Sequence, residues 1–140
     1  MGLRRLAREY ALQILYAIDV CKLKVEEAQQ SFWEGHKSGK KVLEFATALV
    51  EGTLKNLPQI DSLIIKHARN WDIHRMASID RNILRQASFE ILYLPDIPIS
   101  VIINEAVELA KKYSTEESGK FVNGILDKIG EARSTKGLKE

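Results

Sequence analysis

Apolar residues recur at spacings of three and four along most of the chain, which is the period of a helix with one buried face. The first stripe places Ala7, Ala11 and Ile18 on one side of a helix. The pattern predicts an all-α fold of six to seven helices. The apolar stripes cover residues 4–20, 25–33, 41–54, 58–68, 78–94, 102–113 and 122–129.

Local start and stop signals support these boundaries. The polar run 36–39 ends the second helix, and Pro58 suits the first turn of the fourth. Ser114 and Glu117 have the spacing of a capping box, in which a hydroxyl and a glutamate three residues later satisfy free amide donors at a helix start. The polar C-terminal tail lacks apolar anchors, so we expect residues 134–140 to be flexible.

The fifth predicted helix, over residues 78–94, differs from the others. Its second half, from residue 87 onward, is apolar almost all the way round, and a helix of this kind is packed on several sides. We therefore expect it in the middle of the fold. Glu90 lies within the apolar run, where a carboxylate must find hydrogen-bond donors or be protonated at a cost. A structural bond to a neighbouring loop or arginine is favoured over a catalytic role.

The composition favours a single helical domain. Only 8 Gly and 3 Pro occur among the 140 residues, too few for the many tight turns of a β-sandwich or barrel. Hydrophobic residues make up 45% of the chain, which is typical of a protein with a packed core. The length excludes a large multidomain enzyme.

The sequence indicates a cytoplasmic protein without a membrane segment. Its single cysteine, Cys21, excludes an intramolecular disulfide and favours a reducing compartment. The N-terminal residues lack the apolar segment of a secretion signal. No uncharged stretch approaches the roughly 20 residues that are needed to span a bilayer.

Catalytic and metal-binding motifs are missing from the sequence. Gly119 and Lys120 lack the preceding glycine and the following hydroxyl of a phosphate-binding loop. The three histidines lie in different segments, without Cys, Asp or Glu at ligand spacing. We therefore expect a protein that is not an enzyme and that holds neither a metal nor a cofactor.

A cluster of basic residues opens the chain. The net charge is only +2, so any binding of a polyanion must come from such local clustering. Arg4, Arg5 and Arg8 precede every acidic residue. Guanidinium groups pair with phosphate in two-pronged geometry and stack on bases, so the cluster suits RNA or DNA. A merely solvated basic end is the other interpretation.

A row of side chains continues from this cluster along the first helix. Arg8, Leu12 and Tyr16 follow one another at four-residue steps on a flank of the apolar stripe. The flank suits a composite partner, or Leu12 and Tyr16 widen the buried face against the helix over 78–94. Asp80, in the first turn of that helix, either offsets the helix dipole or awaits a donor on another chain.

Four motifs stand out in the chain: RRLAREYALQILY at 4–16, DRNILR at 80–85, INEAVELAK at 103–111 and KFVNGILD at 120–127. Together with Trp71 and Arg75, they resemble the NusB family of bacterial transcription antitermination factors, in the same order and nearly from end to end. One departure is Leu6, where many relatives continue the run of arginines. The departure implies a modest RNA affinity for this protein alone and a greater dependence on its partner.

The resemblance implies two small packed helical bundles, at about 1–57 and 58–133, and a nonenzymatic role. Family members pair with the ribosomal protein NusE and bind the boxA element of nascent ribosomal RNA, which helps RNA polymerase read through terminators. By position, the residues matched to RNA contact are Arg4, Arg5, Arg8, Lys120 and Phe121. Those matched to NusE contact are Tyr16 and Asp80, to which the row on the first helix adds Leu12.

Two further points concern the chain as a whole. A related helical domain is fused to ribosomal RNA cytosine methyltransferases, but we expect only the binding module here, because the chain ends before such a domain begins. The alternative function is a helical protein-interaction adaptor without direct RNA contact. The sequence leaves open whether the free protein is a monomer or a homodimer.

Overall fold

Seven helices form the protein in a computed structural model, which describes residues 2–139 and the side chains of residues 2–133. The helices are α1 (Leu3–Cys21), α2 (Val25–Gly35), α3 (Lys40–Lys55), α4 (Leu57–His67), α5 (Ser78–Tyr93), α6 (Ile99–Tyr113) and α7 (Glu116–Lys139). The described residues contain no strand, so the predicted all-α fold is confirmed. Every apolar stripe became a helix.

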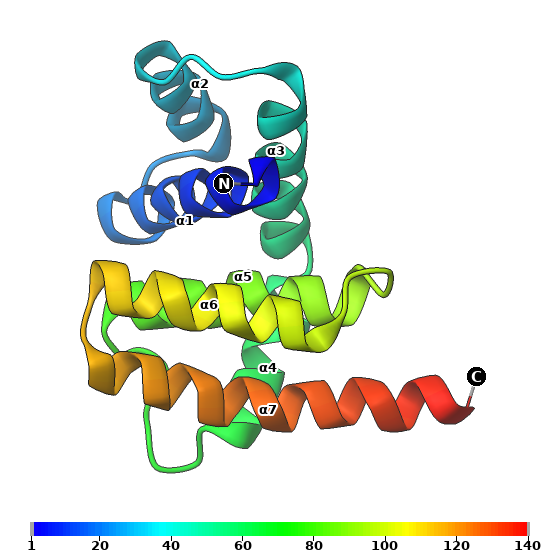
Figure 1. Cartoon of the computed structure of the whole chain (residues 1–140). Coiled ribbons are helices and arrows are strands. Elements are labelled where there is room, and N and C mark those ends of the chain that lie inside the picture. The colour runs from blue at the N-terminus through cyan, green and yellow to red at the C-terminus, as the bar shows by residue number, and fades with distance from the viewer. Residues whose placement is uncertain (1, 140) are drawn as a thin grey trace.

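The helices form two groups, which Figure 1 shows one above the other. Helices α1, α2 and α3 make up the first group, and α4, α5, α6 and α7 make up the second. Helix α1 packs against α3 within its own group and against α5 in the other, which joins the two. Asn56 alone separates α3 from α4. The division of the chain into domains near this residue stays a prediction.

Helix α5 lies in the middle of the fold, as its sequence predicts. It contacts α1, α3, α4, α6 and α7, and every residue from 82 to 91 is buried. Helix α3 comes close to it at Gly52, where a Cβ atom would overlap the ring of Phe89. The two helices therefore approach one another because residue 52 has no side chain. This central helix is the support on which both groups are assembled.

The start of α7 differs from the predicted capping box. The helix begins at Glu116, and Thr115 is the capping residue: its Oγ1 atom accepts a hydrogen bond of 3.0 Å from the amide of Ser118. The pairing predicted for Ser114 and Glu117 is wrong by one residue. A serine occupies the position three residues after the cap, so only the hydroxyl half of a capping box forms.

The two remaining expectations concern the C-terminal tail and the membrane. Helix α7 continues to Lys139. The side chains of residues 134–140 lie outside those that the structure describes, so the flexible tail stays a prediction. In the described part of the chain, no helix has an apolar stretch long enough to cross a bilayer.

Candidate functional site

The three arginines at the start of α1 have three different environments, and that of Arg8 is internal. Arg8 is only 4% exposed, and Glu90 of α5 is 2% exposed. Their side chains meet with Nη2 of the arginine 2.8 Å from Oε1 of the glutamate and Nε 3.0 Å from Oε2. The structural role expected for Glu90 is confirmed. The guanidinium of Arg8 is not free at the surface, in contrast to its place in the predicted RNA-contacting cluster.

Arg5 joins α1 to α6 and stays accessible. Its Nη2 atom lies 2.6 Å from Oε2 of Glu105, while 52% of the arginine side chain is exposed. The hydrogen bonds from Arg5 hold the pKa of Glu105 below its ordinary value, so this carboxylate is ionised at neutral pH. Exposed ion pairs contribute little stability. A phosphate group can therefore replace Glu105 as the partner of Arg5 at a small cost.

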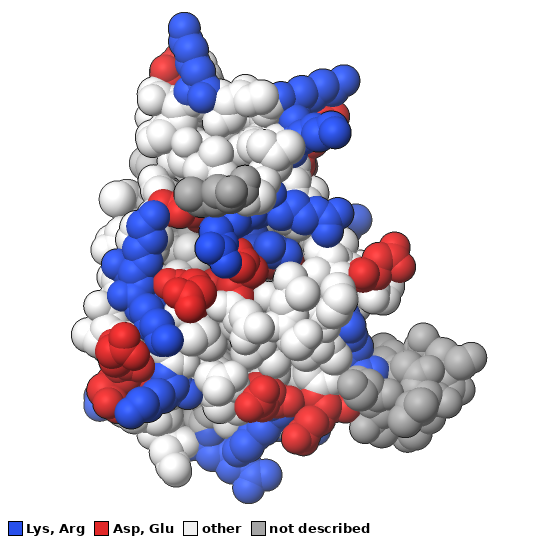
Figure 2. Space-filling model, viewed as in Figure 1, with Lys and Arg blue, Asp and Glu red and all other residues white. Residues whose placement is uncertain are grey.

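Of these three arginines, Arg4 is exposed and forms no ion pair with a described residue. Its guanidinium carbon lies 5.0 Å from the centre of the Phe45 ring of α3, the geometry of a cation–π contact. Figure 2 shows basic side chains gathered around the beginning of α1, with acidic ones beside them. The beginning of α1 thus offers two reachable guanidiniums, those of Arg4 and Arg5.

The structure separates Leu12 from Tyr16. Leu12 is 1% exposed and lies in the core, so it widens the buried face and is not available to a partner. Tyr16 is partly exposed. One turn further along α1, Asp19 accepts a hydrogen bond of 2.7 Å from Arg81 of α5. This bond fixes the half of α1 that carries Tyr16 against the first turn of α5, which carries Asp80.

Asp80 lies in a hollow of about 630 Å³ between the start of α5 and the start of α7, hereafter the α5–α7 hollow. Its lining residues are Trp71, Arg75, Met76, Ala77, Asp80, Glu117, Ser118, Lys120 and Phe121. Asp80 is 7% exposed, and its Oδ2 atom accepts a hydrogen bond of 3.2 Å from the Ser118 hydroxyl. Its Oδ1 atom has no partner in the part of the chain that the structure describes.

Burial is the main influence on the charge of Asp80. It raises the pKa of this carboxyl above the ordinary value, and the hydrogen bond from Ser118 offsets only part of the rise. From the sequence, Asp80 either offsets the helix dipole or awaits a donor on another chain. In this structure a donor of the same chain, the Ser118 hydroxyl, already occupies one of its carboxylate oxygens. The other carboxylate oxygen, Oδ1, is buried and accepts no hydrogen bond from a described residue.

Lys120 and Phe121 line the same α5–α7 hollow. The Phe121 ring meets Trp71 edge to face, with ring centres 5.4 Å apart, and Trp71 is 58% exposed. Lys120 is exposed, with its Nζ atom 3.6 Å from a carboxylate oxygen of Glu117. An exposed and a partly buried aromatic ring beside a cation suit a nucleobase and its phosphate. The structure thereby brings together Asp80 and the Lys120–Phe121 pair, which the resemblance assigns to different partners.

Three side chains that shape these surfaces were not identified as site residues from the sequence. Glu105 is 100 residues away from Arg5, and Asp19 is 62 residues away from Arg81. No local pattern reveals such pairs. Phe45 was assigned to an apolar stripe, and only its place at the edge of that stripe distinguishes it from a core residue.

Comparison with known proteins covers nearly the whole chain. The NusB family model matches residues 5–131. The transcription antitermination protein NusB of Pelotomaculum thermopropionicum is 53% identical over 129 residues, which span 92% of this chain and 90% of that protein. The NusB protein of Trichlorobacter lovleyi is 47% identical over 129 residues, spanning 92% of this chain and 91% of that protein.

Solved structures share the same arrangement of helices. T. maritima NusB superposes with a TM-score of 0.85 at 39% identity and covers 94% of this chain and 92% of that one. A chain from a crystal structure of the antitermination factors NusB and NusE in complex with dsRNA superposes with a TM-score of 0.87 at 33% identity, covering 94% of this chain and 98% of that one. The family model, the relatives and the solved structures each cover nearly the whole chain, and the chain belongs to the NusB family.

Proposed function

We propose that this protein is a cytoplasmic, RNA-binding transcription antitermination factor. It pairs with NusE, and the pair binds the boxA element of nascent ribosomal RNA and joins the RNA polymerase complex that reads through terminators. The observation that carries the proposal is the pair of accessible guanidiniums at the start of α1, those of Arg4 and Arg5. The shared fold of the NusB chain that was crystallised with NusE and dsRNA supports it.

Phosphate groups of the RNA bind at the start of α1. Arg5 exchanges the Glu105 carboxylate for a phosphate, and Arg4 contributes a guanidinium that no carboxylate of the described residues neutralises. Arg8 acts from inside, since its bond to Glu90 fixes the position of the helix. The Lys120–Phe121 pair supplies a second contact, with a cation for phosphate and a ring for a base.

NusE binds near Tyr16 and Asp80, and Asp80 lies in the same α5–α7 hollow as the Lys120–Phe121 pair. A buried acceptor without a partner costs about 1–3 kcal/mol. Oδ1 of Asp80 is itself buried in the free protein, so a NusE donor removes this cost only where binding opens the α5–α7 hollow to it. The partly exposed ring of Tyr16 adds apolar contact from α1.

The test combines a fluorescently labelled boxA RNA, NusE and this protein, with fluorescence anisotropy as the measurement. The three components together should give a salt-sensitive complex that is tighter than either pairwise mixture. A scrambled RNA of equal length is the control. Equal binding of the boxA and scrambled RNAs would contradict the proposal.

Replacing Arg4 and Arg5 by Ala separates RNA binding from the adaptor function. An RNA-binding factor loses the complex with RNA, whereas an adaptor keeps its protein complex at every RNA concentration. The matched control is Lys24→Ala with Lys55→Ala, since these two exposed lysines lie outside both surfaces. If the arginine and lysine variants behave alike, the arginines are merely solvated.

A further inference from the structure

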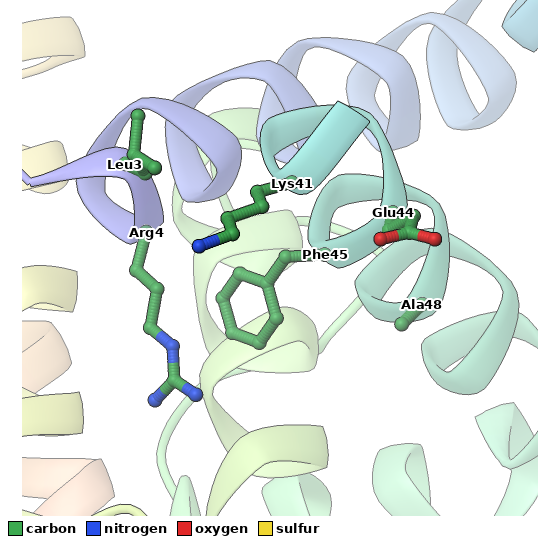
Figure 3. Close-up of a pocket in the computed structure, with 6 residues that line it drawn as sticks. All are labelled: Leu3, Arg4, Lys41, Glu44, Phe45 and Ala48. Carbon is green, nitrogen blue, oxygen red and sulfur yellow. The ribbon is translucent and has the colours of Figure 1, made fainter. Parts of the chain in front are cut away.

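A second hollow opens between the start of α1 and the first half of α3, hereafter the α1–α3 hollow. It has a volume of about 460 Å³. Figure 3 shows its lining residues, which are Leu3, Arg4, Lys41, Glu44, Phe45 and Ala48. Of these, only Arg4 belongs to the RNA surface proposed above. Leu3 precedes Arg4 on α1, and the other four lining residues lie on α3.

Phe45 is held at this hollow by arginines of α1. The Arg4 guanidinium carbon lies 5.0 Å from the ring centre, and that of Arg8 lies 5.7 Å from it. Arg8 is fixed by its buried bond to Glu90, so it supports the ring from the inside of the protein. The ring is only partly buried. A flat apolar surface is therefore held in place beside an exposed guanidinium.

Lys41 adds a second exposed cation. In Figure 3, the side chains of Arg4 and Lys41 extend to the same side of α3 as the Phe45 ring, and the Glu44 carboxylate points the other way. Among the described residues, neither Arg4 nor Lys41 forms an ion pair. Two unneutralised cations beside an aromatic ring complement a phosphate linked to a base.

We propose that the α1–α3 hollow binds one further nucleotide of single-stranded RNA, with its base against the Phe45 ring and its phosphate between Arg4 and Lys41. The inference rests on the proposed function, because the nucleotide continues the RNA segment that Arg4 and Arg5 hold. It extends the RNA-binding surface from α1 onto α3. Since Arg4 belongs to both places, the added nucleotide directly adjoins the segment on α1.

The experiment compares boxA RNA with two longer RNAs that carry three extra uridines at the 5′ or the 3′ end. Each is titrated against the complex of this protein with NusE. One of the longer RNAs should bind at least about fivefold tighter than boxA RNA, as expected for one base stacked on an aromatic ring. An abasic site at the contacting uridine keeps the phosphate and should remove most of this gain.

Protein variants locate the gain in affinity. Phe45→Leu keeps an apolar side chain in the partly buried position and loses the flat ring, and Lys41→Gln loses the charge. Each variant should bring the ratio of the affinity for the extended RNA to the affinity for boxA RNA toward one. In Phe45→Leu the abasic site should have no further effect. The matched control is Lys40→Gln, one residue earlier on α3 and outside the hollow, which should keep the full ratio. Thermal unfolding shows that each variant is folded.

Several outcomes overturn the inference. If neither extension gains affinity, or if the ratio is unchanged in Phe45→Leu and Lys41→Gln, the hollow binds no nucleotide. If these variants change self-association in analytical ultracentrifugation and leave the ratio intact, the occupant is a second copy of the chain. In all three cases the proposed function still holds if the wild type binds unextended boxA RNA. If the wild type does not bind unextended boxA RNA either, both the inference about the hollow and the proposed function are wrong.

Discussion

At the scale of single residues, environment decides what a charged side chain does. Arg5 and Arg8 are three residues apart on one helix, yet one is half exposed and the other is buried against Glu90. The sequence distinguishes them poorly, because both are arginines near the same flank of a helical stripe. The difference comes from α5 and α6, which contact α1 only in the folded protein. We therefore assign contact to Arg5 and positioning to Arg8.

Removing one member of the buried pair should strongly destabilise the protein. In Arg8→Ala, Glu90 is left as a buried charge without a partner, so the free energy of unfolding should fall by about 3–5 kcal/mol. Arg5→Ala should lower it by less than about 1 kcal/mol, because that pair is exposed. Urea unfolding measures both. The double variant Arg8→Met with Glu90→Leu should recover most of the loss. Equal stability of Arg8→Ala and Arg5→Ala would show that Arg8 is not buried in solution.

Asp80 should lower the stability of the free protein and raise its affinity for NusE. Its pKa is raised by burial, so the folded protein disfavours the charged form, and stability declines as pH rises from the ordinary aspartate pKa through the raised value. Asp80→Asn removes this charge. Relative to the wild type, it should be as stable at low pH and more stable at pH 7, measured by urea unfolding at both. Its affinity for NusE should fall about tenfold or more. A variant that is less stable at pH 7 and binds NusE normally would contradict both roles.

At the scale of helices, the apolar pattern predicts the elements well because the pattern is local. The central place of α5 follows from its own apolar run, and the helix spans Ser78–Tyr93, close to the predicted range 78–94. Contacts between helices follow no local pattern. The bond between Arg5 and Glu105 spans 100 residues, and the burial of Leu12 depends on which helix covers that flank. For this reason the sequence predicts the fold and identifies the start of α1 as a candidate site. It does not show which side chains of that site are exposed.

Glu105 of α6 should restrain RNA binding through Arg5. In Glu105→Gln the guanidinium is released, so affinity for boxA RNA should rise about two- to fivefold, the size of an exposed ion pair. Its lowered pKa also means that this pair stabilises the fold above the ordinary glutamate pKa and is lost as pH falls through the lowered value. The variant should thus lose less stability between pH 7 and pH 3 than the wild type does. A drop in RNA affinity would mean that Glu105 positions Arg5 for RNA.

The contact of α3 with α5 should tolerate no side chain at Gly52. Gly52→Ala places a methyl group against the Phe89 ring, and such overpacking should cost about 1–3 kcal/mol in urea unfolding. Gly124→Ala on α7 is the matched control, because a Cβ there meets nothing within 4 Å and alanine favours a helix. Equal effects of the two substitutions would mean that the helices are not in close contact at Gly52.

At the scale of the whole molecule, the proposed RNA binding of a nearly neutral protein depends on a few well-placed cations. The net charge of +2 gives no general attraction to a polyanion, so affinity depends on where guanidiniums are both exposed and unneutralised. The start of α1 carries Arg4, which has no ion pair among the described residues, and Arg5, whose one carboxylate partner is exchangeable. The buried Arg8–Glu90 pair supports this end of the helix from inside. Position, more than total charge, determines the function.

The most direct measurement is the salt dependence of the complex formed by boxA RNA, NusE and this protein. The logarithm of the association constant is plotted against the logarithm of the salt concentration, for the wild type and for Arg4→Gln with Arg5→Gln. Each lost phosphate contact should reduce the slope by about 0.7, hence by about 1.4 for the double variant. Lys24→Gln with Lys55→Gln should follow the wild type. Parallel lines for the arginine variant and the wild type would show that these guanidiniums do not touch the RNA.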